Sequence, residues 1–329
     1  MRPPLLIVNP ACGARSTARS LPQVLARVEQ TLGDVVIRCT ARRGHARELA
    51  HEGAREGYPL IVAVGGDGTF SEVANGVLAF EDKTRAPGQA TEPVAEDAPE
   101  TAPAVGLINV GTGGDFRRSL GIEAGFEHCL QALVSGRERL VDVGRASFPA
   151  MDGSPLEQYF VNVLSAGLGG LVDRYIDGMP SFLGGRIGYY LAALGAVIAS
   201  KERPLQARIM SGGEVREEMI PAYLVAVCNG RWFGGGMDVA PMAKPDDGRF
   251  EVVTVTARSK PYLADRVRGV YTGRHLEEPT VHHFPCERLE LRLEDKVAER
   301  RFLLDVDGEA LGSLPLSVEV APARLCVRA

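Results

Sequence analysis

One segment constrains this chain more than any other: residues 60–78, LIVAVGGDGTFSEVANGVL, join an apolar run, a glycine-rich turn and a helical pattern. A Gly-Gly-Asp-Gly sequence alone is also compatible with a plain turn between two elements. After it, however, apolar residues recur at the spacing of one buried helix face, at Phe70, Val73, Ala74, Val77 and Leu78. The segment therefore predicts a strand, a turn and a helix. Glu72 and Asn75 fall on the opposite helix face, where they would face a ligand.

The turn has the composition of a phosphate site. Because glycine has no Cβ, we expect Gly65, Gly66 and Gly68 to take positive φ and to let a ligand approach the backbone closely. The backbone N–H groups from Thr69 onward would face an anion at the start of the helix. Asp67 does not fit passive phosphate binding, since a carboxylate repels a phosphate unless a divalent cation lies between them. An acid here indicates Mg²⁺ and phosphoryl transfer.

Length, charge and cysteine content limit the class of protein. With 329 residues the chain is long enough for two domains. Its 37 Lys and Arg against 42 Asp and Glu give a formal charge of -5, so no basic field indicates nucleic acid as a partner. None of its six cysteines forms a Cys-x-x-Cys pair, which argues against a zinc ribbon or a disulfide framework.

Hydropathy predicts no membrane anchor. The apolar run at residues 5–8 is too short for a signal peptide, and the longest uncharged stretch, residues 187–200, is shorter than the roughly twenty residues of a spanning helix. We therefore expect a protein that is not anchored by a transmembrane span.

The first part of the chain alternates strand and helix signals, which is typical of a parallel sheet. Strands are predicted at residues 5–8, 35–39, 60–64 and 104–110, and helices at 17–32, 45–56, 69–78 and 116–120. In an open parallel sheet the turns after the strands gather at the carboxyl edge, where ligands bind. Residues 81–103 have no apolar period and are dense in Pro, Ala and acids, so they are predicted to form a flexible insertion.

From about residue 140 the pattern becomes β-rich, which predicts a sandwich or a barrel. The expected strands are residues 159–164, 205–210, 222–228, 250–256, 289–293, 302–306 and 316–320. Helices are expected at 187–200 and 262–272.

An ordered set of short segments resembles the diacylglycerol kinase catalytic-domain family of lipid kinases, which includes bacterial soluble lipid kinases, sphingosine kinases and ceramide kinases. The segments are VNPACG (8–13), Thr40 with GHARELA (44–50), VGGDGTFSEVANG (64–76), GTGGDFRRSLGI (111–122), VDVGR (141–145), FVNVLSAGLGG (160–170), CNGRWFGGGMDVAPMAKPDDGRF (228–250) and VDGE (306–309). Together they extend over nearly the whole chain.

The resemblance implies an α/β N-terminal domain with a mostly parallel sheet and a larger, antiparallel β-sandwich-like C-terminal domain, with ATP in the cleft between them. The expected boundaries are residues 1–139 for the nucleotide-binding domain and 140–317 for the lipid-substrate domain, with the tail 318–329 returning to the first.

The resemblance also implies roles for individual residues. Phosphate contacts are implied for the glycine loop, and further nucleotide contacts for Asn9, Thr40 and Thr112. Arg15 follows the NPxxG segment, where it would reach a phosphate or remain a solvated loop arginine. Glu72 is included with the nucleotide set because of its place beside the loop. The phosphate loop itself is Gly65, Gly66, Asp67, Gly68 and Thr69.

The acids carry the implied chemistry. Asp307 corresponds to the family's base at the attacking hydroxyl, with Glu309 beside it, and Asp115 would order a metal or neighbouring acids. Asp246 and Asp247 match a segment that holds a supporting Mg²⁺, in addition to Mg²⁺ at Asp67. Phosphoryl transfer requires an aligned γ-phosphate, a cation and a carboxylate that accepts the hydroxyl proton. From spacing alone, the Asp307–Gly308 pair predicts a hairpin turn. A turn residue can also present a catalytic carboxylate, so the two interpretations of Asp307 are compatible.

Two loops depart from the family pattern. Cys12 stands where relatives commonly have Ser, and Gly114 where they have Asn, so hydrogen bonding in these loops is expected to differ. The altered loops leave open a non-catalytic nucleotide or lipid sensor, although the acids Asp67, Asp115 and Asp307 are retained. An NAD kinase shares the GGDG loop, but the long β-rich region favours the lipid branch.

The favoured function is an ATP- and Mg²⁺-dependent lipid kinase that phosphorylates a hydroxyl of a membrane lipid, diacylglycerol first, with ceramide or a sphingoid base as alternatives. The expected partner is lipid at the membrane surface, and a homodimer is left open. Residues 182–199 form either a wall for the lipid tail or core packing. Basic residues that would dock on anionic bilayers, or simply be solvated, are Arg42, Arg43, Arg117, Arg118, Lys201 and Arg203.

Overall fold

The computed structural model describes residues 2–12, 15–85, 102–111, 113–177, 192, 195–197 and 199–329, with the side chains of 15–20, 83–85, 173, 176, 177 and 264–268 left aside. The chain divides into two compact units. The first unit is Met1–Val141 with Ala323–Ala329, and the second is Asp142–Pro322. Both divisions fall inside strands, β5 (Glu138–Pro149) and β18 (Leu316–Arg328), two and five residues from the boundaries expected at 139 and 318.

The first unit is built on a parallel sheet, as expected. Its strands lie in the order β2 (Val36–Cys39), β1 (Leu5–Val8), β3 (Leu60–Gly65) and β4 (Ala104–Asn109). The last residues of the chain extend this sheet, because Val327 of β18 pairs with Val105 of β4. β1 and β3 are buried along their whole length, which is the continuous apolar pattern of strands covered on both faces.

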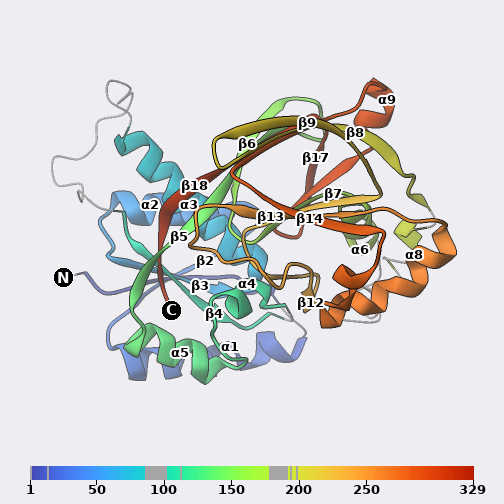
Figure 1. The fold of residues 1–329 in the computed structure, drawn as a ribbon. Helices are drawn as coiled ribbons and strands as arrows, with labels where there is room; N and C mark the ends of the chain where they lie inside the picture. Colours follow the sequence, from blue (N-terminus) through green and yellow to red (C-terminus); the bar gives the residue numbers. More distant parts are fainter. Residues whose placement is uncertain are drawn as a thin grey trace. The chain divides into compact units, whose positions relative to one another are not determined.

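Helices cover both faces of this sheet (Figure 1). α2 (His45–Arg55) and α3 (Asp67–Arg85) pack together on one face, and Gly53 of α2 lies directly against Leu5 and Ile61. α1 (Arg15–Leu32) and α5 (Phe126–Ser135) share a core with the other face. α4 (Asp115–Ser119) is a single short turn after β4. The five apolar residues predicted for the buried face of α3 are all buried.

The insertion begins later than the sequence indicated. α3 continues to Arg85, so Glu81 and Asp82 are helical rather than part of a flexible segment. Both acids form ion pairs with Arg324, which lies near the C-terminal end of β18. The distance between Arg324 and the Glu81 carboxylate is 3.0 Å. This partner lies far away in sequence, and local composition therefore misplaced the helix end. The remainder of the predicted insertion, 86–101, lies outside the described residues.

The second unit is an antiparallel β-sandwich. One sheet contains β9 (Glu214–Ala222), β8 (Arg203–Ser211), β15 (Arg288–Arg292), β18, β5 and β6 (Pro155–Phe160). The other contains β14 (Val281–Cys286), β13 (Phe250–Val255), β10 (Leu224–Cys228), β7 (Val163–Gly167), β16 (Leu303–Val306) and β17 (Glu309–Ser313). Buried residues of both sheets form one core, in which the rings of Phe160 and Phe250 lie 5.4 Å apart.

Some predicted elements of this unit are wrong in detail. The strand expected at 159–164 is two strands, β6 and β7, because the backbone bends at Val161 and Asn162. The helix expected at 262–272 is α8 (Lys260–Arg266) followed by a 3₁₀ turn, η2 (Val267–Thr272). Most of residues 182–199, proposed as a wall for the lipid tail, lies outside the described residues. In the described part of the chain, no helix has the length and apolar character needed to cross a membrane.

Shorter elements complete the second unit: α6 (Leu168–Asp177), η3 (Arg274–Glu277), α9 (Lys296–Glu299), and the small hairpin of β11 (Trp232–Phe233) and β12 (Met237–Asp238). In the sheet that contains β5, β18, β15, β8 and β9, a row of ion pairs crosses these five strands and makes one face of the sheet polar. The row is Arg145–Glu319–Arg288–Glu290–Arg208–Glu217.

The burial of His275 predicts that the stability of the second unit depends on pH. Its buried imidazole has Nε2 2.9 Å from the carbonyl oxygen of Val239, and burial lowers the pKa of the side chain. A pKa below that of the unfolded chain gives stability that is present above the unfolded value and is lost as the pH falls. We expect the melting temperature to fall more steeply from neutral to mildly acidic pH in the natural protein than in His275→Gln. Parallel pH profiles for the two proteins would show that this histidine has no such effect.

Candidate active site

The glycine turn between β3 and α3 is tighter than expected. β3 ends at Gly65 and α3 begins at Asp67, and none of Gly65, Gly66 and Gly68 has positive φ. That expectation is wrong because the helix begins at once. The glycines are required instead by close approach: a Cβ on Gly65 would lie 2.4 Å from Oγ1 of Thr69, and a Cβ on Gly111 would lie 2.9 Å from Cα of Gly66.

Polar residues that follow the strands of the first unit meet at the carboxyl edge. Asn9, after β1, donates from Nδ2 to Oγ1 of Thr69 on α3 over 3.1 Å, and its Oδ1 accepts from the N–H of Ala11. Thr40, after β2, donates its N–H to the carbonyl oxygen of Val8. The structure thus brings Asn9 and Thr69 together as neighbours beside the glycine turn. Of the other predicted nucleotide contacts, Thr112 and the side chain of Arg15 lie outside the described residues.

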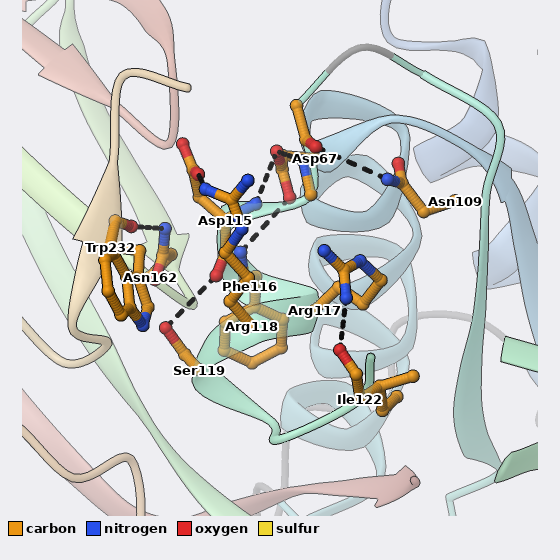
Figure 2. Close-up of polar contacts among 12 residues, drawn as sticks. Asp67, Asn109, Asp115, Phe116, Arg117, Arg118, Ser119, Ile122, Asn162 and Trp232 are labelled. Atoms are coloured by element: carbon orange, nitrogen blue, oxygen red, sulfur yellow. Dashed lines mark hydrogen bonds and ion pairs between the residues drawn. The ribbon is translucent and has the colours of Figure 1, made fainter. Parts of the chain in front are cut away.

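Asp67 holds the start of α4. Its Oδ2 accepts the backbone N–H groups of Gly114 at 2.6 Å and Asp115 at 3.1 Å, and its Oδ1 accepts that of Phe116 at 3.2 Å (Figure 2). Gly113 makes room for this contact, because a Cβ there would lie 2.5 Å from Oδ2. The amide donors stabilise the negative charge of Asp67, so a cation is not needed to explain an acid in the glycine turn.

Asp115 and its neighbours anchor α4 to the same site. Asp115 is buried, with 7% of its side chain exposed, and its Oδ1 accepts from Nη1 of Arg118 over 3.2 Å. Ser119 donates its hydroxyl to the carbonyl oxygen of Asp115 (Figure 2). Arg117 points elsewhere: it is 3% exposed and donates to the carbonyl oxygen of Ile122. Arg117 is therefore unsuited to the bilayer-docking role that the sequence suggested for it.

The departure at Gly114 has a steric explanation. Gly114 has φ of 101°, and a Cβ on it would lie 2.5 Å from Nδ2 of Asn109 and 3.1 Å from Nε of Arg117. Asn109 at the end of β4 and the buried Arg117 thus occupy the space that a larger side chain would need. The departure at Cys12 leaves a half-buried thiol whose pKa is raised by burial.

Glu72 and Asn75 make contacts within the protein. Glu72 accepts the N–H of Gly44 at 2.8 Å through Oε1 and that of Ala46 at 3.0 Å through Oε2. It therefore caps α2, whose N-cap residue, Gly44, has no side chain that does so. Asn75 is buried and donates to the carbonyl oxygen of Ser71. These contacts account for two polar residues that sequence reasoning placed beside a ligand.

Asp307 occupies a tight turn in the second unit, as its Asp-Gly sequence predicted. Asp307 and Gly308 join β16 to β17 with φ of 52° and 88°, the two positive values of a type I′ hairpin turn. The carboxylate of Asp305 accepts the N–H of Gly308 over 2.7 Å and so fixes the turn. Glu309, the other predicted catalytic acid of this segment, is the first residue of β17.

The Asp307 carboxylate binds the bend between β6 and β7. Its Oδ2 accepts the N–H of Val161 at 2.8 Å, and its Oδ1 accepts those of Asn162 at 2.9 Å and Val163 at 3.2 Å. Three consecutive amides thus converge on one carboxylate, as they do at Asp67 in the first unit. Asn162 in turn donates from Nδ2 to the carbonyl oxygen of Trp232 (Figure 2).

Asp142 is a structural acid that sequence reasoning missed. It is buried, accepts the N–H of Gly248 over 2.7 Å and donates its own N–H to the carbonyl oxygen of Pro245. It thereby fixes the loop that carries Asp246 and Asp247. The only sequence signal for its burial was its position between two apolar residues, in Val-Asp-Val.

Asn229 is another structural residue that sequence reasoning missed. It is fully buried and donates from Nδ2 to the carbonyl oxygens of Asp142 and Val161.

Within the described residues, no group of three or more His, Cys, Asp or Glu side chains is arranged for a metal ion. Asp246 and Asp247 are adjacent and exposed, and Oδ2 of Asp247 lies 3.2 Å from Nε of Arg249. They are oxygen donors of the kind that Mg²⁺ prefers.

Comparison with known proteins agrees with this architecture. Residues 3–146 match the family model for the diacylglycerol kinase catalytic domain, and residues 162–329 match that for the YegS C-terminal NAD kinase β-sandwich-like domain. A diacylglycerol kinase of Bacillus subtilis is 30% identical over 319 residues, covering 94% of this chain and 90% of the relative. The chain belongs to the diacylglycerol kinase catalytic-domain family. It is a lipid kinase, a phosphotransferase, and membership of this kinase family implies use of ATP.

Other diacylglycerol kinases match this chain over nearly its whole length at lower sequence identity. A diacylglycerol kinase of Staphylococcus saprophyticus is 25% identical over 313 residues, with 94% of this chain and 90% of the relative covered. A solved diacylglycerol kinase structure from Bacillus anthracis, 22% identical, superposes with a TM-score of 0.65 over 99% of this chain and 96% of the other. That structure supports the fold: an α/β domain with a mostly parallel sheet and an antiparallel β-sandwich-like domain.

The contacts of Asp67 predict a loss of stability on its substitution. In Asp67→Asn, the amide NH₂ faces N–H donors that the carboxylate accepted, and we expect the free energy of unfolding to fall by about 2 kcal/mol. Asp34→Asn is the matched control, since Asp34 is exposed and the charge change is identical. It should change stability by less than about 0.5 kcal/mol. Urea unfolding compares the two, and equal stabilities would contradict the structural role of Asp67.

Proposed function

We propose that the protein transfers the γ-phosphoryl group of ATP to a hydroxyl of a membrane lipid, and that diacylglycerol is this lipid. The observation that carries the proposal is that the turns after β1, β3 and β4 contact one another at the carboxyl edge of the sheet in the first unit. Asn9 forms a hydrogen bond with Thr69, Gly66 packs on Gly111, and Asp67 accepts an N–H group at the start of α4. The substrate is supported by relatives named diacylglycerol kinase that match nearly the whole chain.

The nucleotide phosphates are assigned to the start of α3. The first N–H groups of a helix have no partner within it, and the macrodipole adds partial positive charge at this end. The N–H of Phe70 already bonds to the carbonyl oxygen of Gly66, so the donors for a phosphate are those of Asp67, Gly68 and Thr69. Because the Asp67 carboxylate accepts amides of α4, its charge does not oppose an anion at these donors.

Mg²⁺ is part of the proposal. This ion is typically bound by one or two carboxylates together with substrate phosphates and water, so the lack of a three-acid cluster among the described residues does not oppose it. Asp67 retains accepting capacity, since an ionised carboxylate has about four lone-pair sites and three N–H groups occupy it. Asp246 and Asp247 are the second candidate ligands. When bound, the ion would neutralise charge on the transferring phosphoryl group.

Asp307 is assigned as the base that accepts the proton of the lipid hydroxyl. The three amides of residues 161–163 fix the plane of its carboxylate, and the Asp305–Gly308 contact fixes the turn that carries it. A base held in one orientation avoids the entropic cost of orienting it during the reaction. Glu309, two residues further, is the alternative base.

Two matched variants separate these assignments. We expect Asp307→Asn to lower kcat by about 10²- to 10⁴-fold, the usual contribution of general base catalysis, with a smaller change in KM. Glu309→Gln should retain most of its turnover. A large loss in Glu309→Gln together with near-normal turnover in Asp307→Asn would transfer the role to Glu309. Melting temperatures of both variants show whether a loss of turnover reflects unfolding.

The substrate is tested with labelled ATP and a panel of acceptors. Diacylglycerol, ceramide and a sphingoid base are offered in mixed micelles, and NAD in solution. We expect label in phosphatidic acid. Label mainly in a phosphorylated ceramide or sphingoid base would replace the substrate, and label in NADP would replace the reaction class. A protein that binds ATP without labelling any acceptor would be the non-catalytic sensor considered from the sequence.

A substrate embedded in a bilayer requires the enzyme to reach the membrane surface. We therefore also propose a cytoplasmic protein that associates peripherally with the inner membrane face. A homodimer remains compatible with the proposal but is not required by it.

A further inference from the structure

The second unit contains a pocket lined by cations and apolar side chains. It has a volume of about 410 Å³ and is formed by α6, residues 199–203 and the segment from Ala298 to β16. The apolar lining includes the buried Phe302 and Leu303 and the side chain of Met151, which is 57% exposed. The cations of the lining are Arg174, Lys201, Arg203, Arg300 and Arg301.

No acidic residue lines this pocket within the described part of the chain. Nor does any of its five cations form an ion pair with a described carboxylate, whereas seven of the nine other arginines of the unit whose side chains are described do, the exceptions being Arg258 and Arg292. The paired arginines are Arg145, Arg208, Arg216, Arg231, Arg249, Arg274 and Arg288. Like charges that line one pocket repel one another. An anion bound among them would relieve this repulsion.

The apolar lining indicates what kind of anion the pocket accepts. A free inorganic anion would gain nothing from Phe302, Leu303 or the exposed Met151, whereas an amphiphile would contact both parts of the lining. A volume of about 410 Å³ is in the range of small-molecule sites. Nucleic acid is disfavoured by the formal charge of -5 and by the small extent of the basic cluster.

We propose that this pocket binds the phosphate headgroup of an anionic phospholipid and so holds the enzyme on the bilayer that contains its substrate. The inference rests on the proposed function, since only a lipid kinase has reason to remain at that surface. It brings together Lys201 and Arg203, which the sequence suggested as docking residues, with three arginines that the sequence did not single out. The cationic pocket is a docking site distinct from Asp307, which is not among the residues that line the pocket.

The test compares two double variants with the same change in charge. Arg300→Gln/Arg301→Gln removes two cations from the pocket, and both side chains are exposed, so the fold should be unaffected. Arg258→Gln/Arg292→Gln is the control, because these residues are exposed and lie outside the pocket. Binding is measured by sedimentation with vesicles that contain phosphatidylglycerol in phosphatidylcholine, and with vesicles of phosphatidylcholine alone.

We expect the pocket variant to bind the anionic vesicles roughly 25-fold more weakly, since each basic residue at such a surface contributes about a fivefold effect. The control variant should bind within about twofold of the natural protein, since residues away from the contact add little to it. Equal losses in both variants would show general charge attraction and overturn the assignment of this pocket. So would undiminished binding by the pocket variant.

Two further measurements distinguish the alternatives. If millimolar sn-glycerol 3-phosphate raises the melting temperature of the natural protein but not that of the pocket variant, and the natural protein does not sediment with anionic vesicles, the pocket recognises a soluble phosphate ester, and the phospholipid assignment is wrong. Turnover of a short-chain, monomeric diacylglycerol should be the same in all three proteins. If the natural protein phosphorylates no lipid, the proposed function fails, but the vesicle binding still decides whether the pocket docks on anionic bilayers.

Discussion

The structure depends on carboxylates that accept backbone N–H groups from distant loops. Asp67 binds three consecutive amides at the start of α4, and Asp307 binds three at the bend between β6 and β7. Glu72 caps α2 in the same manner, and Asp142 fixes the loop before β13. Loops and helix ends leave such donors without partners in their own element, and a buried unpaired N–H costs free energy. The acids supply these missing acceptors.

Because of these hydrogen bonds, Asp67 and Asp307 have a structural role in addition to the chemical roles proposed for them. The sequence suggested that an aspartate in a glycine turn implies a metal ion, but the amides of α4 already stabilise the charge of Asp67. The same aspartate is therefore structural whatever else it binds. Asp307 combines two properties in the proposed mechanism: its carboxylate is oriented by amides, and the residue lies in a two-residue hairpin turn. Substitution of either residue would disturb loop geometry as well as chemistry, so stability and turnover have to be measured together.

Much of the fold was predictable because local pattern and final burial agree. The apolar strand and the helical period around Gly65–Gly66 gave β3 and α3, and the Asp307–Gly308 pair gave its hairpin turn. The prediction failed where long-range partners decide. The end of α3 depends on Arg324, and β9 is a strand although most of it is exposed, because it pairs with β8. The contact of Glu72 with the start of α2 was likewise not predictable, because its partners Gly44 and Ala46 lie far away in the sequence.

Backbone hydrogen exchange at these loops tests the central claim most directly. In the natural protein the amides of Gly114, Asp115 and Phe116, and those of residues 161–163, should be protected from exchange. In Asp67→Asn the first set should exchange faster while residues 161–163 keep their protection, and in Asp307→Asn the reverse should hold. If both sets exchange at unchanged rates in both variants, these carboxylates do not hold the loops, and the account of the site is wrong.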